Sequence, residues 1–341
     1  MSSQAESPQE SRSRSKTTPN TLPFDRPPAA PDERDMLLRA AAGWDETPRA
    51  MRGLLEVDVL IADPITPIHD RVAALVEACD PFCADLLCLA AGLGRGAGAG
   101  TRRGPEDLPA IIARFGLAGF RRMVELVASR NLFRATSAPV SRRLSEIWWH
   151  SLARAEAMRL VAERVEVPRR WLTGNLYTAG LFADVGAMFL LWLVEQARLP
   201  AADDGGLLAS TLELIGEHHE WVGEDLLQRW GMAVDITRTA GNHHGRRSGG
   251  RTPFWPIVAI AGQIADEVVE PLCVVAHVRE PAEAAAHFLP LGVEERRHLL
   301  FAVRKQVEGL RNVLEPVLAP PAAPSTGATA PASPAARRRA G

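Results

Sequence analysis

Apolar residues recur at steps of three and four along most of this chain, and no run of alternating residues is long enough for a sheet. Steps of three and four place apolar side chains on one face of an α-helix, whereas the face of a strand requires alternation. Gly116 and Gly231 follow such runs and are typical of positions where a helix ends. The sequence therefore predicts an all-α fold. The periodic runs lie at residues 72–76, 86–89, 111–127, 147–161 and 212–227.

The ends of the chain differ in composition from its middle. Residues 1–32 are rich in Ser, Pro and charge, residues 319–341 are rich in Pro and Ala, and neither segment shows periodicity. Such segments bury too little apolar surface to fold, so we expect two disordered tails. Between them we expect a helical domain over residues 50–280 and a separate C-terminal helix over residues 290–318.

The C-terminal helix carries a narrow apolar seam that repeats at steps of three and four. A seam of this kind is typical of a helix that pairs with another helix. Two arrangements are open: a homodimer through residues 293–317, or packing of this helix onto its own domain. The seam consists of Leu300, Val303, Val307, Leu310, Leu314 and Val317.

Composition narrows the possible partners and compartments. The chain has 341 residues, 46% of them hydrophobic, and a formal net charge of −2, which argues against a dedicated DNA-binding protein. The longest apolar stretch, residues 186–194, is about half of the ~20 residues that a membrane span needs. Four cysteines are too few for a disulfide scaffold, and Cys79, Cys83 and Cys88 are expected to be core thiols. We expect a cytoplasmic protein that binds neither DNA nor membrane.

Histidines and carboxylates are scattered through the apolar segments. Asp184 lies inside AGLFADVGAMFLL, where an unpaired buried charge would be costly and a partner is needed. Imidazole and carboxylate groups together suit Fe, Mn, Zn or Ni. Two interpretations of these residues are open: they bind a metal ion, or they form a hydrogen-bonded polar cluster in the core. The other conspicuous polar residues are His150, His218, His219, His243, His244 and Asp266.

The order of the segments WWHSL, AGLFADVGAMFLL, HHEWVGEDLLQRWG, NHHG and IADE resembles the HDOD family. HDOD proteins are bacterial signalling relatives of the HD-domain metal-dependent phosphohydrolases. The resemblance covers roughly residues 55–275, and it implies a two-lobed helical domain with an HD-like C-terminal lobe. It also implies a ligand set for one divalent metal ion: His150, Asp184, His219, His243, His244 and Asp266.

Two departures from the HD pattern bear on catalysis. Ala183 stands where HD proteins have the His of their His-Asp doublet, and an alanine side chain can bind no metal. The Gly-Tyr-Pro motif of relatives that cleave cyclic diguanylate is replaced by GRRSGGRTPFWP. The resemblance therefore implies a degenerate metal site.

We expect a non-catalytic module of signal transduction that binds a partner protein or a small ligand. Arg246 and Arg247 follow the His pair and are candidate binding residues for a phosphate-bearing ligand, although a solvated Gly-rich turn is the simpler explanation of both. The alternative is a metal-dependent phosphohydrolase acting on a nucleotide or cyclic nucleotide, with Asp184 and Asp266 as metal ligands. The resemblance also places Glu146 where some dinuclear members have a carboxylate.

Overall fold

A computed structural model describes residues 33–79, 82–95, 107–164, 175–196, 206–245, 255–269 and 291–318. Within these ranges the regular structure is helical and contains no strand, which confirms the all-α prediction. The two predicted tails, residues 1–32 and 319–341, lie outside the described residues, and so do Arg246 and Arg247.

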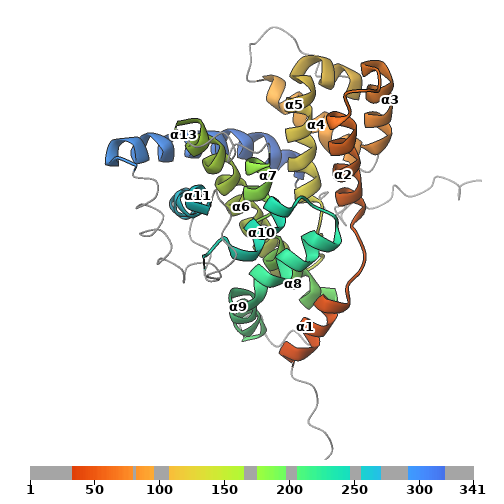
Figure 1. Cartoon of the computed structure of the whole chain (residues 1–341). Coiled ribbons are helices and arrows are strands. Elements are labelled where there is room, and N and C mark those ends of the chain that lie inside the picture. Colours follow the sequence, from red (N-terminus) through yellow and green to blue (C-terminus); the bar gives the residue numbers. More distant parts are fainter. Residues whose placement is uncertain are drawn as a thin grey trace, which may run out of the picture.

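Four helices form the first lobe, at the upper right of Figure 1. They are α2 (Arg49–Ala62), α3 (Ile68–Ala78), α4 (Cys83–Arg95) and α5 (Leu108–Arg130). Helix α5 packs against the other three. As its sequence predicts, α5 is interrupted at Gly116, whose φ of 69° lies in the left-handed region that favours glycine.

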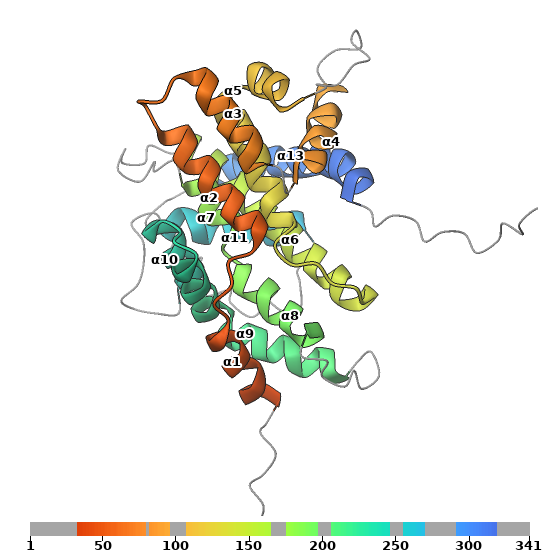
Figure 2. The same ribbon diagram turned by 90° about the vertical axis from the view of Figure 1, so that its right-hand side faces the viewer.

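The second lobe contains the polar segments. It consists of α6 (Ala138–Arg164), α7 (Leu176–Leu181), α8 (Val185–Gln196), α9 (Gly206–Arg229), α10 (Val234–Asn242) and α11 (Trp255–Val268). Helix α6 packs against α7, α8 and α11, while α9 packs against α8 and α10. An additional helix, α1 (Glu33–Gly43), begins before the domain predicted from the sequence and packs on α8 and α9. Its place beside them is visible in Figures 1 and 2.

Helix α13 (Val293–Leu318) joins the two lobes. It packs against α4 of the first lobe and against α6 and α11 of the second. Of its predicted seam, Val303, Val307 and Leu314 are buried, and Leu300 and Leu310 are partly buried. The seam therefore packs onto its own chain, and a homodimer through this helix stays a prediction.

The most apolar part of the chain lies in the interior. Residues 176–196 are long and apolar enough to cross a membrane by length and composition, but 94% of their apolar window is buried by protein. A buried core segment of a soluble protein has these properties. It is also divided, because α7 ends at Leu181 and α8 begins at Val185. Asp184 lies in the turn between them.

Candidate metal centre

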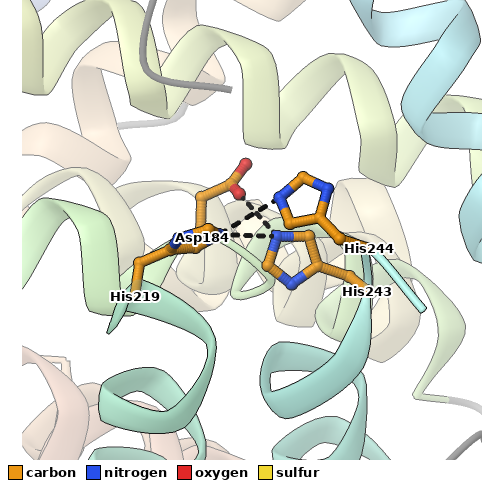
Figure 3. A group of neighbouring side chains, drawn as sticks. All are labelled: Asp184, His219, His243 and His244. Carbon is orange, nitrogen blue, oxygen red and sulfur yellow. Dashed lines mark hydrogen bonds and ion pairs between the residues drawn. The ribbon is translucent and has the colours of Figure 1, made fainter. Parts of the chain in front are cut away.

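Four of the six side chains expected at the site converge on one point in the second lobe. Asp184 comes from the α7–α8 turn, His219 from α9, and His243 and His244 from the end of α10. One potential ligand atom from each lies within 4.8 Å of those of the others, and all four side chains are buried. Figure 3 shows the three imidazole rings and the carboxylate turned toward one another.

Backbone carbonyls determine which ring nitrogen carries the proton, that is, the tautomer, in two of these histidines. His219 Nδ1 lies 2.7 Å from the carbonyl oxygen of Ile215, and His243 Nδ1 lies 3.0 Å from that of Ala240. A carbonyl oxygen only accepts, so each Nδ1 donates its proton and each Nε2 of a neutral ring can accept a hydrogen bond or bind a metal ion. This is the arrangement found in histidines that bind metals.

The Nε2 atoms of the three histidines face one another. His219 Nε2 lies 3.3 Å from His243 Nε2 and 3.1 Å from His244 Nε2. Asp184 Oδ1 lies 3.0 Å from His243 Nε2, but the geometry is not that of a hydrogen bond, and this buried oxygen has no hydrogen-bond donor. A cation placed among these nitrogens and the carboxylate oxygen could be bound by all four side chains. The four side chains therefore fit one divalent ion of the nitrogen- and oxygen-binding class.

The second carboxylate oxygen of Asp184 faces a different set of groups. His150 Nδ1 lies 3.0 Å from Oδ2, Arg154 donates to Oδ2 over 2.8 Å, and Ser151 donates over 3.3 Å. The other ring nitrogen of His150, Nε2, lies 2.9 Å from Oδ1 of Asp266. Both ring nitrogens of His150 are thus engaged by carboxylates of this chain.

Burial and charge set the protonation of the cluster. Burial alone would raise the pKa of Asp184, but the Arg154 charge, the hydrogen bond with His150 and the nearby His243 imidazole hold it well below 3.8. Burial and Arg154 would lower the pKa of His150, yet its bonds to the two carboxylates raise it above 6.5. For His244, burial and the neighbouring imidazoles lower the pKa well below 6.5, so this ring is neutral and its nitrogen can bind a metal.

The remaining expected residues have different positions. Asp266 contacts the cluster only through His150, and its side chain is 46% exposed. Ala183 is fully buried and contributes a methyl group where a His would stand. Glu146 does not belong to the cluster. Its carboxylate pairs with Arg143 over 2.7 Å.

Three polar side chains of the site were not among those expected. Arg154 and Ser151 bind Asp184, and Glu220 accepts a 2.9 Å hydrogen bond from the backbone N–H of His244. Arg154 follows His150 by four residues and Glu220 directly follows His219, so spacing was the only signal for either.

Residues 101–246 match the model of the HDOD domain. The chain carries an HDOD domain. This match confirms the resemblance drawn from the order of the polar segments. No curated protein matches the chain.

Solved structures share the helical fold at low sequence identity. An HDOD domain protein of unknown function from Geobacter sulfurreducens is 21% identical, with a TM-score of 0.55, and the match covers 83% of this chain and 97% of that one. A protein from Shewanella amazonensis SB2B, provisionally described as a metal-dependent phosphohydrolase, is 14% identical with a TM-score of 0.56, covering 83% and 98%. A second protein from that organism, provisionally described as a phosphohydrolase, is 17% identical with a TM-score of 0.52, covering 82% and 97%.

Proposed function

We propose that this protein is a non-catalytic regulatory module of bacterial signal transduction that works in the cytoplasm. In this proposal the HDOD domain binds a partner protein or a small ligand, and its polar cluster holds one divalent metal ion. The observation that carries the proposal is the engagement of both His150 ring nitrogens, by Asp184 over 3.0 Å and by Asp266 over 2.9 Å. Ala183 supplies no ligand here, and Oδ2 of Asp184 already accepts a hydrogen bond from Arg154.

The loss of one half of the site argues against hydrolysis. A dinuclear hydrolase holds two metal ions about 3.5–4 Å apart on a shared carboxylate and activates a water between them. Here Asp184 faces three histidines with one oxygen only, and its other oxygen accepts hydrogen bonds from Arg154 and Ser151. That arrangement supports a site for a single ion.

The number of protein donors supports a structural ion. Three imidazoles and one carboxylate give four donors, as in structural zinc sites, whereas catalytic zinc sites leave one position to water. When bound, an ion of Fe, Mn, Zn or Ni would supply positive charge and Lewis acidity at this point. The four side chains would hold the α7–α8 turn, α9 and the end of α10 together.

Elemental analysis of the tag-free protein, with Asp184→Ala alongside, tests the proposal. We expect about one metal ion per chain, its loss in Asp184→Ala, and no turnover of nucleotides or cyclic nucleotides by either protein. A metal-free wild-type protein would contradict the single-ion site. Phosphate release that disappears in Asp184→Ala would contradict the non-catalytic role.

A phosphohydrolase acting on a nucleotide or cyclic nucleotide is the second candidate. It is favoured by the convergence of a buried carboxylate with three imidazoles, a donor set that can also activate water. The two candidates differ in turnover by the metal-loaded protein, so the same assay distinguishes them.

A further inference from the structure

Arg154 places a buried guanidinium inside the polar cluster. Its side chain is 3% exposed, and its NH1 donates to Asp184 Oδ2 over 2.8 Å. It lies on α6, one turn beyond His150. A buried charge is costly unless an opposite charge compensates it, and here the compensating charge is that of Asp184.

The Nε atom of this guanidinium makes no hydrogen bond within the described part of the chain. The nearest helix there, α11, presents Gly262. A Cβ placed on Gly262 would lie 3.7 Å from Arg154 Nε, so the guanidinium fits against a position without a side chain. Arg154 therefore contributes positive charge at Asp184 more than a network of hydrogen bonds.

The two oxygens of Asp184 divide the cluster into two sides. Oδ1 lies on the side of His219, His243 and His244, and Oδ2 lies on the side of His150. A second metal ion on this carboxylate would have to bind Oδ2, where the Arg154 guanidinium already donates. Cations that share one carboxylate oxygen in a buried site repel each other strongly.

We propose that Arg154 is a built-in cation that takes the place of a second metal ion, so that this site holds one divalent ion and excludes another. The inference rests on the proposed use of the cluster as a metal site. It deepens that proposal by naming the residue that limits the number of ions. It also means that restoring the missing histidine by Ala183→His is not sufficient for a second ion while Arg154 is present.

Equilibrium dialysis against Mn²⁺, followed by elemental analysis, measures the limit. We expect one Mn²⁺ per chain in the wild type and two in Arg154→Met, because the place of Arg154 at Asp184 Oδ2 is then open to an ion, with His150 and Asp266 beside it. Arg154→Lys keeps the charge and should stay at one. Arg159→Met removes an arginine from the same helix that pairs with Glu156 and Glu163, and should also stay at one.

A further variant locates the additional ion. In Arg154→Met/Asp266→Asn the count should return to that of the wild type, because the Asp266 carboxylate beside His150 is then no longer present as a ligand for the additional ion. If Arg154→Met fails to fold, as judged by its circular dichroism, Arg154→Gln takes its place in the dialysis.

The outcomes separate this inference from the proposed function. If Arg154→Met binds one ion more than the wild type, this gain supports the role of Arg154 whatever the wild type binds. A wild type that binds no ion would contradict only the single-ion proposal. An equal count in both proteins overturns the role of Arg154. So does a spin-coupled pair of Mn²⁺ ions in the electron paramagnetic resonance spectrum of the saturated wild type.

Discussion

Glu220 Oε1 accepts a 2.9 Å hydrogen bond from the backbone N–H of His244. The same oxygen lies 3.9 Å from His243 Nδ1, and the Glu220 side chain is 9% exposed. Because Glu220 belongs to α9 and the two histidines follow α10, this one carboxylate holds the end of α10 against the helix that carries His219. It acts as a positioning residue for the candidate metal centre.

Glu220→Ala should therefore weaken metal binding without removing a ligand. Residues that orient metal ligands typically contribute about 10–100-fold to affinity, and we expect a loss in this range. Calorimetric titration of the metal-free protein with Zn²⁺ measures it. Glu220→Gln keeps an oxygen acceptor and should bind within a few-fold of the wild type. Equal weakening in both variants would show that charge, rather than the hydrogen bond, is what matters.

Gly186 sets the distance between α8 and α9. A Cβ at this position would lie 2.1 Å from the carbonyl oxygen of His219 and 2.5 Å from the backbone nitrogen of Gly223. These are backbone atoms, so Gly186→Ala must push the helices apart. We expect a loss of several kcal/mol in the free energy of unfolding, at the upper end of single substitutions (about 4 kcal/mol or more), and a displaced His219.

Gly309→Ala is the matched control for that substitution. Gly309 lies within α13, and a Cβ there would meet nothing within 4 Å. In a helix interior alanine is favoured over glycine by about 0.5–1 kcal/mol, so this variant should be slightly more stable than the wild type. Urea unfolding of both variants checks the pair, and similar midpoints would refute the close approach of α8 and α9.

The sequence predicted an all-α chain and named six candidate ligands, of which four converge, but it did not predict the contacts that organise the site. Helical periodicity is local, and a carboxylate such as Asp184 is conspicuous in an apolar segment, so both could be recognised without a structure. The pairing of Arg154 with Asp184 joins α6 to the α7–α8 turn and exists only after folding. In a chain where all but two of 39 basic residues are arginine, the residue type of Arg154 was not distinctive, and its spacing of four from His150 was the only indication. Helix α1 was also missed, because its short sequence, ERDMLLRAAAG, mixes charged residues with alanine and has no long apolar periodicity.

Glu125 should make stability depend on pH. Its side chain is 2% exposed and pairs with Arg121 over 3.0 Å. Burial raises the pKa of this carboxyl above 4.5, and the Arg121 charge and the Thr178 hydroxyl offset only part of the rise. The folded state thus holds the proton more tightly than the unfolded state. Protonation of Glu125 therefore stabilises the folded state. This stabilisation is fully present below the unfolded pKa of 4.5 and is lost as pH rises through the folded pKa.

Urea unfolding between pH 4 and 7 tests this linkage through Glu125→Gln, which cannot ionise. The wild type should lose stability relative to Glu125→Gln as pH rises across this range. Glu308→Gln, at an exposed position of α13, should show no such trend relative to the wild type. A wild type that gains stability relative to Glu125→Gln would mean that the ion pair with Arg121 dominates.

The thiols of the first lobe should differ sharply in reactivity. Burial raises the pKa of Cys79 to about 12, with a smaller effect from Cys83. Cys88 is exposed, which corrects the expectation that it is a core thiol, and Cys83 is partly buried. Because the thiolate is the reactive species, Cys79 should be inert at neutral pH in the folded protein.

A Cys83→Ser/Cys273→Ser variant isolates the comparison, since it keeps only Cys79 and Cys88. Titration with a chromogenic disulfide reagent at pH 8 should label one thiol rapidly, and the second only in denaturant. Rapid labelling of both without denaturant would indicate that α3 and α4 open readily.

Two neighbouring residues of α13 separate its packing within the chain from pairing between chains. Val303 is fully buried, whereas the Phe301 residue is 71% exposed. Val303→Ala should lower the free energy of unfolding by about 1.5–3 kcal/mol, because the apolar surface that Val303 buries is lost. Its mass in light scattering should equal that of the wild type, since the buried face contacts α4, α6 and α11.

Phe301→Ser should change stability by no more than about 0.5 kcal/mol. A homodimer that uses this helix can do so only through surface left free by that packing, so Phe301→Ser should then halve the mass. A dimer that dissociates in Val303→Ala but not in Phe301→Ser would contradict the packing of the seam onto its own domain.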